Sequence, residues 1–187
     1  SRCGNWVVVS GCTGFLGPYL VAALAAAHPS ADRVVCLVRG EDDAGATARF
    51  RAVYAAAIGA EPEPRVVVRA ADLEAEKLGL SADVYAEIVG GVGLVVHSGA
   101  RVNLSLPYAG LEAANVSGTR RMLELALLGG AAFRFVSTVG AVTATATART
   151  ISTTTVQTCR TPVRKTPTRM ASETPATSAW PATTIST

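Results

Sequence analysis

Aromatic residues are scarce in this sequence, and its positive charges are scattered. Phe, Trp and Tyr make up 5% of the chain, and the formal net charge is +3. A nucleic-acid-binding domain usually presents a basic face together with aromatic rings that stack on bases. The shortage of both features argues against a nucleic-acid partner.

Long apolar runs are also missing. The apolar stretch 19–27 ends at His28 and Pro29 and is much shorter than the roughly 18 residues that a membrane span needs. We therefore expect no membrane segment. The start of the chain shows no basic segment before an apolar core, so we expect no secretory signal. Because the first residue is Ser1, we interpret the chain as a piece excised from a longer polypeptide, with a trimmed terminus as the alternative.

The four cysteines form no Cys-x-x-Cys pair and have no metal-ligand spacing with the two histidines. This pattern predicts no metal site, and it suits a reducing cytoplasm, which is the location that we expect. Cys36 lies in an apolar strand-like run, and we expect it to be an inert core residue.

Strand-like and helix-like patterns alternate up to residue 142. The sequence predicts strands over 5–10, 32–39, 65–73, 92–100 and 132–141, and helices over 15–27, 46–59, 81–91 and 108–130. The alternation is typical of a parallel sheet with right-handed crossovers, and near-continuous Val and Leu runs suit strands buried on both faces. We therefore predict an α/β fold, a Rossmann-type doubly wound parallel sheet with the strand order 3-2-1-4-5. Gly59 is the predicted C-cap of the second helix, and Ser81 the predicted N-cap of the third.

The composition changes abruptly at residue 143. The segment 143–187 holds 16 threonines and no Gly, Leu, Phe, Tyr or Asp, whereas all 17 glycines precede it. Such a segment buries too little apolar surface to offset its ordering entropy, so we expect it to be largely disordered. If it cannot pair with the fifth strand, the edge of that strand is open and prone to aggregation. We predict a dinucleotide-binding domain over 1–142 and a low-complexity Thr-rich tail over 143–187. A Thr/Pro-rich linker and a shifted reading frame near residue 142 are two possible origins of the tail, and both make it non-catalytic.

Three glycines follow the first predicted strand and open the first helix. Gly11 permits a tight turn, Gly14 lets backbone N–H groups approach a pyrophosphate, and Gly17 lets helix and strand pack closely. The helix N-terminus then faces the anion with unpaired N–H groups and the positive end of its dipole. Plain turn glycines are the alternative, but the strand–loop–helix context favours a dinucleotide site. The other predicted contacts in this loop are Thr13, Phe15 and Leu16.

The end of the second strand indicates which dinucleotide binds. Arg39 stands where an NAD-specific site carries an acid for the ribose hydroxyls, and its guanidinium can hold a 2′-phosphate bidentately. Arg49 in the next helix can add a second charge. Glu41 and Asp42 are nearby acids, and either of them bonding a ribose is the alternative. We predict NADP(H) as the cofactor.

Two further strand ends complete the predicted cofactor site. Asp72 and Leu73 leave the third strand where an adenine ring lies in such a sheet, although Asp72 is equally consistent with a helix cap. Ser98, Gly99 and Ala100 end the fourth strand, where small residues leave room for the ribose and the nicotinamide.

Several motifs together resemble a known family. The stretches GCTGFLG, CLVRG, AADL, HSGARVN, ANVSGT and FRFVSTV look like the extended short-chain dehydrogenase/reductases. Within that family they are most similar to the thioester reductase domains that end nonribosomal peptide and polyketide synthases and carboxylic acid reductases. The resemblance covers about residues 5–142, roughly three quarters of the chain.

This resemblance implies an NADPH-dependent reduction of an acyl or peptidyl thioester held on a carrier domain's phosphopantetheine arm, in the same or a partner chain. Hydride reaches the thioester carbonyl, a hemithioacetal collapses, and an aldehyde leaves, which some members reduce again to an alcohol. By resemblance, Thr138 matches the catalytic hydroxyl position, with Ser137 beside it. Asn115 matches a helix Asn that fixes the neighbouring loop at the cofactor site.

The sequence departs from the family at the catalytic Tyr-x-x-x-Lys motif, which the family places beyond the Thr. The last tyrosine is Tyr108, and the only lysines are Lys77 and Lys165. In the family the Tyr donates a proton and the Lys lowers the Tyr pKa, so without them most of the rate advantage is lost. We therefore interpret the chain as the NADPH-binding portion of a thioester reductase with impaired activity. A non-catalytic dinucleotide-binding module and a truncated inactive fragment are the alternatives.

Overall fold

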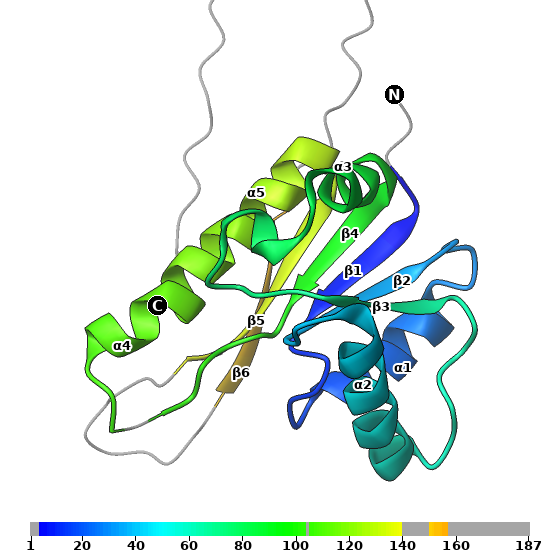
Figure 1. Ribbon diagram of the computed structural model, residues 1–187, viewed down its shortest axis with the longest axis horizontal. Coiled ribbons are helices and arrows are strands. Elements are labelled where there is room, and N and C mark those ends of the chain that lie inside the picture. Colours follow the sequence, from blue (N-terminus) through cyan, green and yellow to red (C-terminus); the bar gives the residue numbers. More distant parts are fainter. Residues whose placement is uncertain (1–3, 104, 140–149, 157–187) are drawn as a thin grey trace, which may run out of the picture.

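Six strands form one sheet in the order β3-β2-β1-β4-β5-β6 in the computed structural model, which describes residues 4–103, 105–139 and 150–156 (Figure 1). The first five strands are parallel to their neighbours, which confirms the predicted order 3-2-1-4-5. They are β1 (Trp6–Ser10), β2 (Val34–Val38), β3 (Val66–Ala70), β4 (Val92–His97) and β5 (Ala132–Val139). The order reverses direction at β1, where β2 lies on one side and β4 on the other, and such a switch point is where open α/β sheets bind ligands.

The sixth strand, β6 (Thr150–Val156), pairs antiparallel with β5 from Phe133↔Val156 to Val139↔Thr150. The sequence analysis did not anticipate this strand, because the threonine-rich composition of 143–187 predicts disorder. Its residues are mostly β-branched, and β-branched residues favour extended backbone. The pairing supplies hydrogen-bond partners to the edge of β5. The remainder of 143–187 lies outside the described residues, and its disorder stays a prediction.

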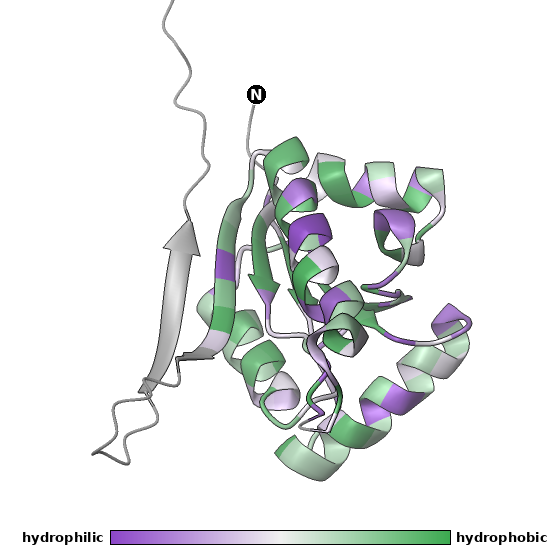
Figure 2. Cartoon of the chain, turned by 90° about the vertical axis from the view of Figure 1, so that its left-hand side faces the viewer, coloured by the Kyte–Doolittle hydropathy of each residue, from purple (hydrophilic) through white to green (hydrophobic). Residues whose placement is uncertain are grey.

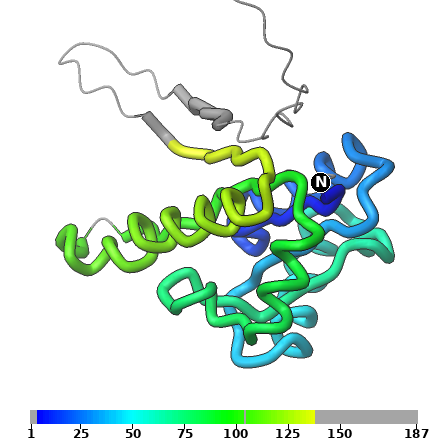
Figure 3. Tube along the Cα trace, turned by 90° about the horizontal axis from the view of Figure 1, so that it is seen from above, coloured from blue at the N-terminus to red at the C-terminus, as the bar shows by residue number. Residues whose placement is uncertain are grey.

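The helices lie where the sequence predicts them, with small shifts at their starts. They are α1 (Gly17–Ala27), α2 (Asp43–Ile58), α3 (Ala82–Gly91), α4 (Tyr108–Glu112) and α5 (Gly118–Gly129), with a 3₁₀ turn η1 (Glu76–Gly79) and a π-helical turn η2 (Ala113–Ser117). Helix α2 begins three residues earlier than predicted, because the Asp42 side chain accepts a hydrogen bond from the Gly45 N–H. Gly59 ends α2 with φ +76°, and Ser81 caps α3 as predicted. The predicted helix 108–130 is one run, α4–η2–α5, interrupted only by the π turn (Figure 3).

The sheet is covered on both faces, as the valine-rich strands require. Helices α3 and α5 pack on one face, and α1 and α2 pack on the other (Figure 1). Neighbouring strand residues alternate between the two faces: Val7 and Val9 contact the α1–α2 side, whereas Val8 contacts the α3–α5 side. Figure 2 shows the apolar character of the central strands beside helices that carry both polar and apolar residues.

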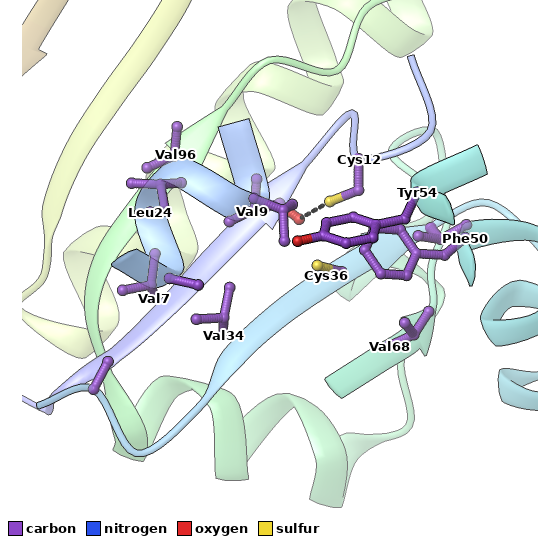
Figure 4. Close-up of a cluster of buried hydrophobic side chains, with 14 of the residues drawn as sticks. Val7, Val9, Cys12, Leu24, Val34, Cys36, Phe50, Tyr54, Val68 and Val96 are labelled. Carbon is purple, nitrogen blue, oxygen red and sulfur yellow. Dashed lines mark hydrogen bonds between the residues drawn. The ribbon is translucent and has the colours of Figure 1, made fainter. Parts of the chain in front are cut away.

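Cys36 belongs to the core on the α1–α2 side, where it lies beside Cys12, Phe50 and Tyr54 (Figure 4). Its predicted place in the core is confirmed. A side-chain hydrogen bond with Cys12 and burial raise the pKa of the Cys36 thiol well above its ordinary value, so this thiol stays protonated. Within the described residues, no group of three His, Cys, Asp or Glu is arranged to hold a metal ion. No helix in the same part of the chain is both long and apolar enough to cross a membrane.

Candidate functional site

A cleft of about 480 Å³ opens at the carboxyl ends of the strands β1 to β4. It lies at the switch point beside β1, where ligands bind in open α/β sheets. Ten residues that the sequence analysis singles out line this cleft: Gly11, Thr13, Gly14, Arg39, Arg49, Asp72, Leu73, Ser98, Gly99 and Ala100. Four strand ends far apart in the sequence therefore meet at one site.

Six predicted site residues are not among the described residues that line the cleft. Phe15 is 95% exposed and Leu16 is 43% exposed, whereas Gly17 is buried in the first turn of α1. Asn115 accepts a hydrogen bond from the Arg101 N–H in the loop after β4, and Ser137 lies half-buried in β5. Thr138 is also in β5, but its side chain lies outside the described residues.

The three glycines of the first loop occupy different environments. Gly11 has φ +78°, and a Cβ atom there would lie 2.6 Å from the Gly99 N atom, so only glycine fits beside β4. At Gly17 a Cβ atom would overlap the carbonyl group of Cys12, which explains the close packing of α1 on β1. At Gly14 the nearest neighbour of such an atom would be the Gly11 carbonyl oxygen at 3.4 Å. Gly14 thus leaves its side of the loop open toward the cleft.

The loop that leads from β1 into α1 lines the cleft with Gly11, Cys12, Thr13 and Gly14, and hydrogen bonds hold it in place. The Gly14 N–H donates to the Gly11 carbonyl oxygen, and the Gly17 N–H donates to the Gly14 carbonyl oxygen, each over 3.1 Å. The buried Cys12 Sγ donates to the Val9 carbonyl oxygen, which fastens the loop to β1 (Figure 4). Among the described residues, no side chain caps α1. The Gly17 N–H is occupied and Pro18 has no N–H, so the start of α1 favours an anion chiefly through the positive end of its dipole.

The end of β2 presents positive charge to the cleft. Arg39 follows β2, and the Arg49 Nη1 donates a hydrogen bond to the Arg39 carbonyl oxygen over 3.2 Å. The alternative that a nearby acid faces the ligand loses support, because Asp42 is occupied as the cap of α2. Glu41 and Asp42 are not among the described residues that line the cleft.

Asp43 is the remaining acid near Arg39, and it is occupied by β3. Its carboxylate accepts hydrogen bonds from the Arg69 guanidinium and from the Ala70 N–H, at 2.7 and 2.6 Å. Desolvation raises the pKa of Asp43, but the Ala70 hydrogen bond and the Arg69 hydrogen bond and charge outweigh it, so the pKa is lowered overall. Asp43 therefore stays ionised and neutralises Arg69, which leaves Arg39 and Arg49 as the cations at this end of the cleft.

The segment after β3 forms the opposite wall. Asp72 Oδ1 accepts a hydrogen bond from the Glu74 N–H at 2.9 Å and so closes a local turn. Asp72 is not the cap of the following 3₁₀ turn η1, because the residue at that N-cap position is Ala75. This turn holds Leu73 against Gly99 and Gly118, where an added Cβ atom would lie 2.9 and 3.0 Å from the Leu73 side chain.

Two arginines tie this wall to the rest of the fold. The Arg121 Nη1 donates to the Leu73 carbonyl oxygen at 3.0 Å, and Arg101 forms an ion pair with Glu74 at 3.3 Å. Arg101 and Glu74 also line the cleft, and the sequence analysis did not single them out.

Asn115 fixes the loop that follows β4. Its Oδ1 accepts from the Arg101 N–H at 2.7 Å, and its Nδ2 donates to the Arg101 carbonyl oxygen at 3.0 Å. Both hydrogen bonds are made by one amide group, so Arg101 is held at its backbone in a fixed orientation. Asn115 lies in the π turn η2, and π turns inside α-helices often occur at functional sites.

A buried polar network, which the sequence analysis did not find, lies behind the cleft. His97 is fully buried at the end of β4 and stacks on Phe135, with ring centroids 5.4 Å apart. Its Nδ1 lies 2.6 Å from Ser10 Oγ, and its Nε2 lies 3.0 Å from Thr119 Oγ1. Burial lowers the pKa of His97 to about 4, so the ring is neutral at neutral pH. The one signal in the sequence was a histidine within an apolar strand.

A second cavity of about 290 Å³ lies at the amino ends of the strands, at the opposite edge of the sheet. Among the described residues that line it, none belongs to the predicted site. The cleft at the carboxyl ends is therefore the candidate site.

Part of this chain is similar in sequence to known reductases. The chain is 38% identical to the glycine betaine reductase ATRR of Emericella nidulans over 141 residues, which cover 72% of this chain and 11% of the relative. It is also 38% identical to a carboxylic acid reductase of Segniliparus rugosus over 129 residues, covering 65% of this chain and 11% of that protein. The chain thus spans about a tenth of the length of these curated relatives.

Solved structures of reductase domains are also similar to this chain. The terminal R domain from the myxalamid PKS-NRPS biosynthetic pathway is similar with a TM-score of 0.58 and 31% identity, over 67% of this chain and 32% of that one. The reductase domain of a nonribosomal peptide synthetase from Mycobacterium tuberculosis has a TM-score of 0.54 and 30% identity, over 65% and 30%. The family model described as "Male sterility protein", an NAD-binding model, matches residues 9–183, so the chain belongs to that NAD-binding family.

Proposed function

We propose that this chain is the NADP(H)-binding portion of a thioester reductase domain. The observation that carries the proposal is the meeting of the glycine loop with Arg39 and Arg49 in one cleft at the sheet's switch point. A dinucleotide needs an anion site for its pyrophosphate and, for NADP(H), a second one for its 2′-phosphate. The glycine loop before α1 is the proposed site of the pyrophosphate, and Arg39 with Arg49 is the proposed site of the 2′-phosphate.

Each wall of the cleft has a proposed role toward the cofactor. In this proposal the loop 11–17 binds the pyrophosphate, with Gly11, Thr13 and Gly14 lining the cleft, and Asp72 with Leu73 borders the adenine. The roles of Phe15 and Leu16 are proposed from the sequence alone. The segment 98–100 borders the ribose and nicotinamide, and Asn115 and Ser137 belong to the same proposed site. When bound, the nicotinamide supplies the hydride for the reduction.

The proposed substrate is an acyl or peptidyl thioester on a carrier domain's phosphopantetheine arm, in the same or a partner chain, and the product is an aldehyde or an alcohol. Relatives whose names include a carboxylic acid reductase and the reductase domain of a nonribosomal peptide synthetase support this substrate class. Thr138 is the proposed hydrogen-bond donor to the thioester carbonyl. The cytoplasm is the proposed location, in keeping with the buried free thiols of Cys12 and Cys36.

Activity in this chain is proposed to be impaired. Beyond Thr138 the sequence holds no tyrosine, so the Tyr-x-x-x-Lys pair of the resembling family is missing. This observation favours a second candidate, a dinucleotide-binding module without catalysis. We propose that residues 1–142 form the dinucleotide-binding domain and that 143–187 follow as a Thr-rich tail, of which β6 alone among the described residues pairs with the edge of that domain's sheet. Sequencing the coding DNA over codons 138–150 tests whether a frame change produced that tail.

Titration of the chain with NADPH and with NADH, followed by cofactor fluorescence, tests the proposal. We expect NADPH to bind at least about tenfold more tightly than NADH, because the two arginines favour the extra phosphate. Failure to bind either cofactor contradicts the function, and tighter binding of NADH contradicts the role of Arg39. Adding an acyl-pantetheine thioester then separates the two candidates: NADPH consumption supports a reductase, and binding without consumption supports the module.

A further inference from the structure

We propose that His97 is a positioning residue that holds the cleft segment 98–101 from both ends, through a one-directional chain of hydrogen bonds from the Gly99 N–H to the Asn115 carbonyl oxygen. The hydrogen-bond chain is a property of the protein alone. Only its consequence for cofactor affinity rests on the proposed function.

The direction of the chain follows from the single proton of Thr119. Its hydroxyl donates to the Asn115 carbonyl oxygen at 2.5 Å, because a carbonyl oxygen can only accept. The Thr119 Oγ1 must then accept in its 3.0 Å contact with His97 Nε2. The proton of the neutral His97 ring is therefore on Nε2.

The other half of the chain follows from that tautomer. With the proton on Nε2, His97 Nδ1 carries only a lone pair, so it accepts the Ser10 hydroxyl proton over 2.6 Å. The Ser10 Oγ in turn accepts from the Gly99 N–H at 3.3 Å. His97 and Ser10 are both buried, so water does not replace a lost partner, and each bond depends on the next.

Both ends of this chain reach the same cleft segment. At one end, Ser10 holds the Gly99 N–H, and the Ser98 hydroxyl donates to the Ser10 carbonyl oxygen at 2.8 Å. At the other end, Thr119 fixes the backbone of Asn115, whose side chain holds the backbone of Arg101. Gly99 and Arg101 both line the cleft and are two residues apart. His97 thus connects the strand that holds the start of this segment with the helix turn that holds its end.

Comparing the variant Thr119→Val with Thr47→Val separates the effect of the hydrogen-bond chain from the general effect of removing a threonine hydroxyl from a helix. Thr47 makes the same kind of bond, to the Asp43 carbonyl oxygen four residues earlier at 2.6 Å, but it lies in α2, away from His97. We expect Thr119→Val to speed amide hydrogen exchange at Gly99 about tenfold, the effect of losing one buried hydrogen bond, and Thr47→Val to leave it unchanged. Nitrogen-15 spectra of the His97 ring should show the proton on Nε2.

Variants at His97 itself test whether the donor and the acceptor matter. His97→Gln keeps one donor and one acceptor, so the Gly99 amide should keep most of its protection from hydrogen exchange. His97→Leu removes both, so that protection should be lost. If His97→Leu does not fold, the comparison of His97→Gln with Thr119→Val remains. A ring protonated on Nδ1, or an unchanged Gly99 amide in Thr119→Val, overturns the proposal.

The binding consequence is measured separately by NADPH titration of the same variants. We expect Thr119→Val to weaken NADPH binding about tenfold and Thr47→Val to leave it unchanged. An unchanged affinity in Thr119→Val overturns the positioning role even if the hydrogen-bond chain exists. If the unmodified chain binds no NADPH, the proposed function fails, but the exchange and nitrogen-15 measurements still decide the hydrogen-bond chain.

Discussion

The Arg49 side chain donates a hydrogen bond to the main-chain carbonyl oxygen of Arg39 over 3.2 Å, which brings a helix residue to the end of β2. Both arginines line the cleft, and Asp42 and Asp43, the nearest acids in the sequence after Glu41, have other partners. Neither guanidinium group forms an ion pair with a carboxylate of the described residues, and such groups donate the strong, charge-assisted hydrogen bonds that a phosphate accepts. This arrangement makes the choice between the two dinucleotides testable with one substitution.

The variant Arg39→Ser should weaken NADPH binding about 10- to 100-fold and change NADH binding by no more than about twofold. A hydrogen bond to a charged group contributes about 1.5–3 kcal/mol, and about 1.4 kcal/mol corresponds to a factor of ten. Fluorescence titration of both cofactors measures the ratio. Arg51→Ser is the control, because Arg51 is exposed on the same helix and is not among the cleft-lining residues. Equal weakening of both cofactors by Arg39→Ser contradicts the assignment of the 2′-phosphate.

The glycines of the first loop should separate binding from stability. In Gly14→Ala the new methyl group contacts only the Gly11 carbonyl oxygen, at 3.4 Å, and fills space toward the cleft. We expect the melting temperature to change by only a few degrees and NADPH affinity to fall at least about tenfold, because backbone can no longer approach the pyrophosphate.

Gly17→Ala is the matched variant in the same loop. Its methyl group overlaps the Cys12 carbonyl group, so α1 must move away from β1. Overpacking of this kind costs about 1–3 kcal/mol of the free energy of unfolding, which urea denaturation measures. If Gly14→Ala is as destabilised as Gly17→Ala, then Gly14 is a plain turn glycine and not an open approach to a ligand.

The sheet could be predicted from the sequence because parallel strands buried on both faces read as continuous valine runs. The helix ends at Gly59 and Ser81 could be predicted because a helix cap depends on only a few adjacent residues. Strand β6 could not be predicted, because its residues have strand propensity but no apolar alternation. Its position is set by the antiparallel pairing with β5, which the sequence does not reveal.

The site was predictable where a strand end carries a recognisable residue, as at Gly11 and Arg39. The His97 network was not, because Ser10 and Thr119 are 87 and 22 residues away from it in the sequence. A histidine in an apolar strand gives no sign of which partners the fold brings to each ring nitrogen. The role of Thr138 stays a prediction, since it comes from family resemblance.

The variant Asn115→Ala should loosen the loop after β4. It removes both hydrogen bonds to the Arg101 backbone, at 2.7 and 3.0 Å. We expect amide exchange at Arg101 to speed up about tenfold or more, because each such bond contributes about 1 kcal/mol. Asn103→Ala is the control: its Oδ1 accepts from the Ser105 N–H at 2.9 Å in the same loop, but it does not hold Arg101. An unchanged Arg101 amide in Asn115→Ala contradicts the loop-fixing role.

Acid should destabilise the fold through His97. The groups in contact with its ring, Ser10, Thr119, Phe133 and Phe135, are uncharged, and burial lowers its pKa from 6.5 to about 4. In the unfolded chain His97 therefore binds a proton below about pH 6.5, whereas in the folded chain it binds one only below about pH 4. The stability that the neutral ring provides is complete above pH 6.5 and is lost as the pH falls toward 4.

Urea denaturation at about pH 7.5 and about pH 5 measures this loss. At about 1.4 kcal/mol for each pH unit, the free energy of unfolding should fall by about 2 kcal/mol between the two conditions. His97→Gln should remove most of this fall, because its amide does not titrate, whereas His28→Gln should keep it. The lowered pKa of Asp43 lies below its ordinary 3.8, so its contribution is lost in more acidic solution and leaves this interval largely unaffected. A fall of equal size in His97→Gln would show that another group binds the proton, and that the buried ring does not set the acid sensitivity of the fold.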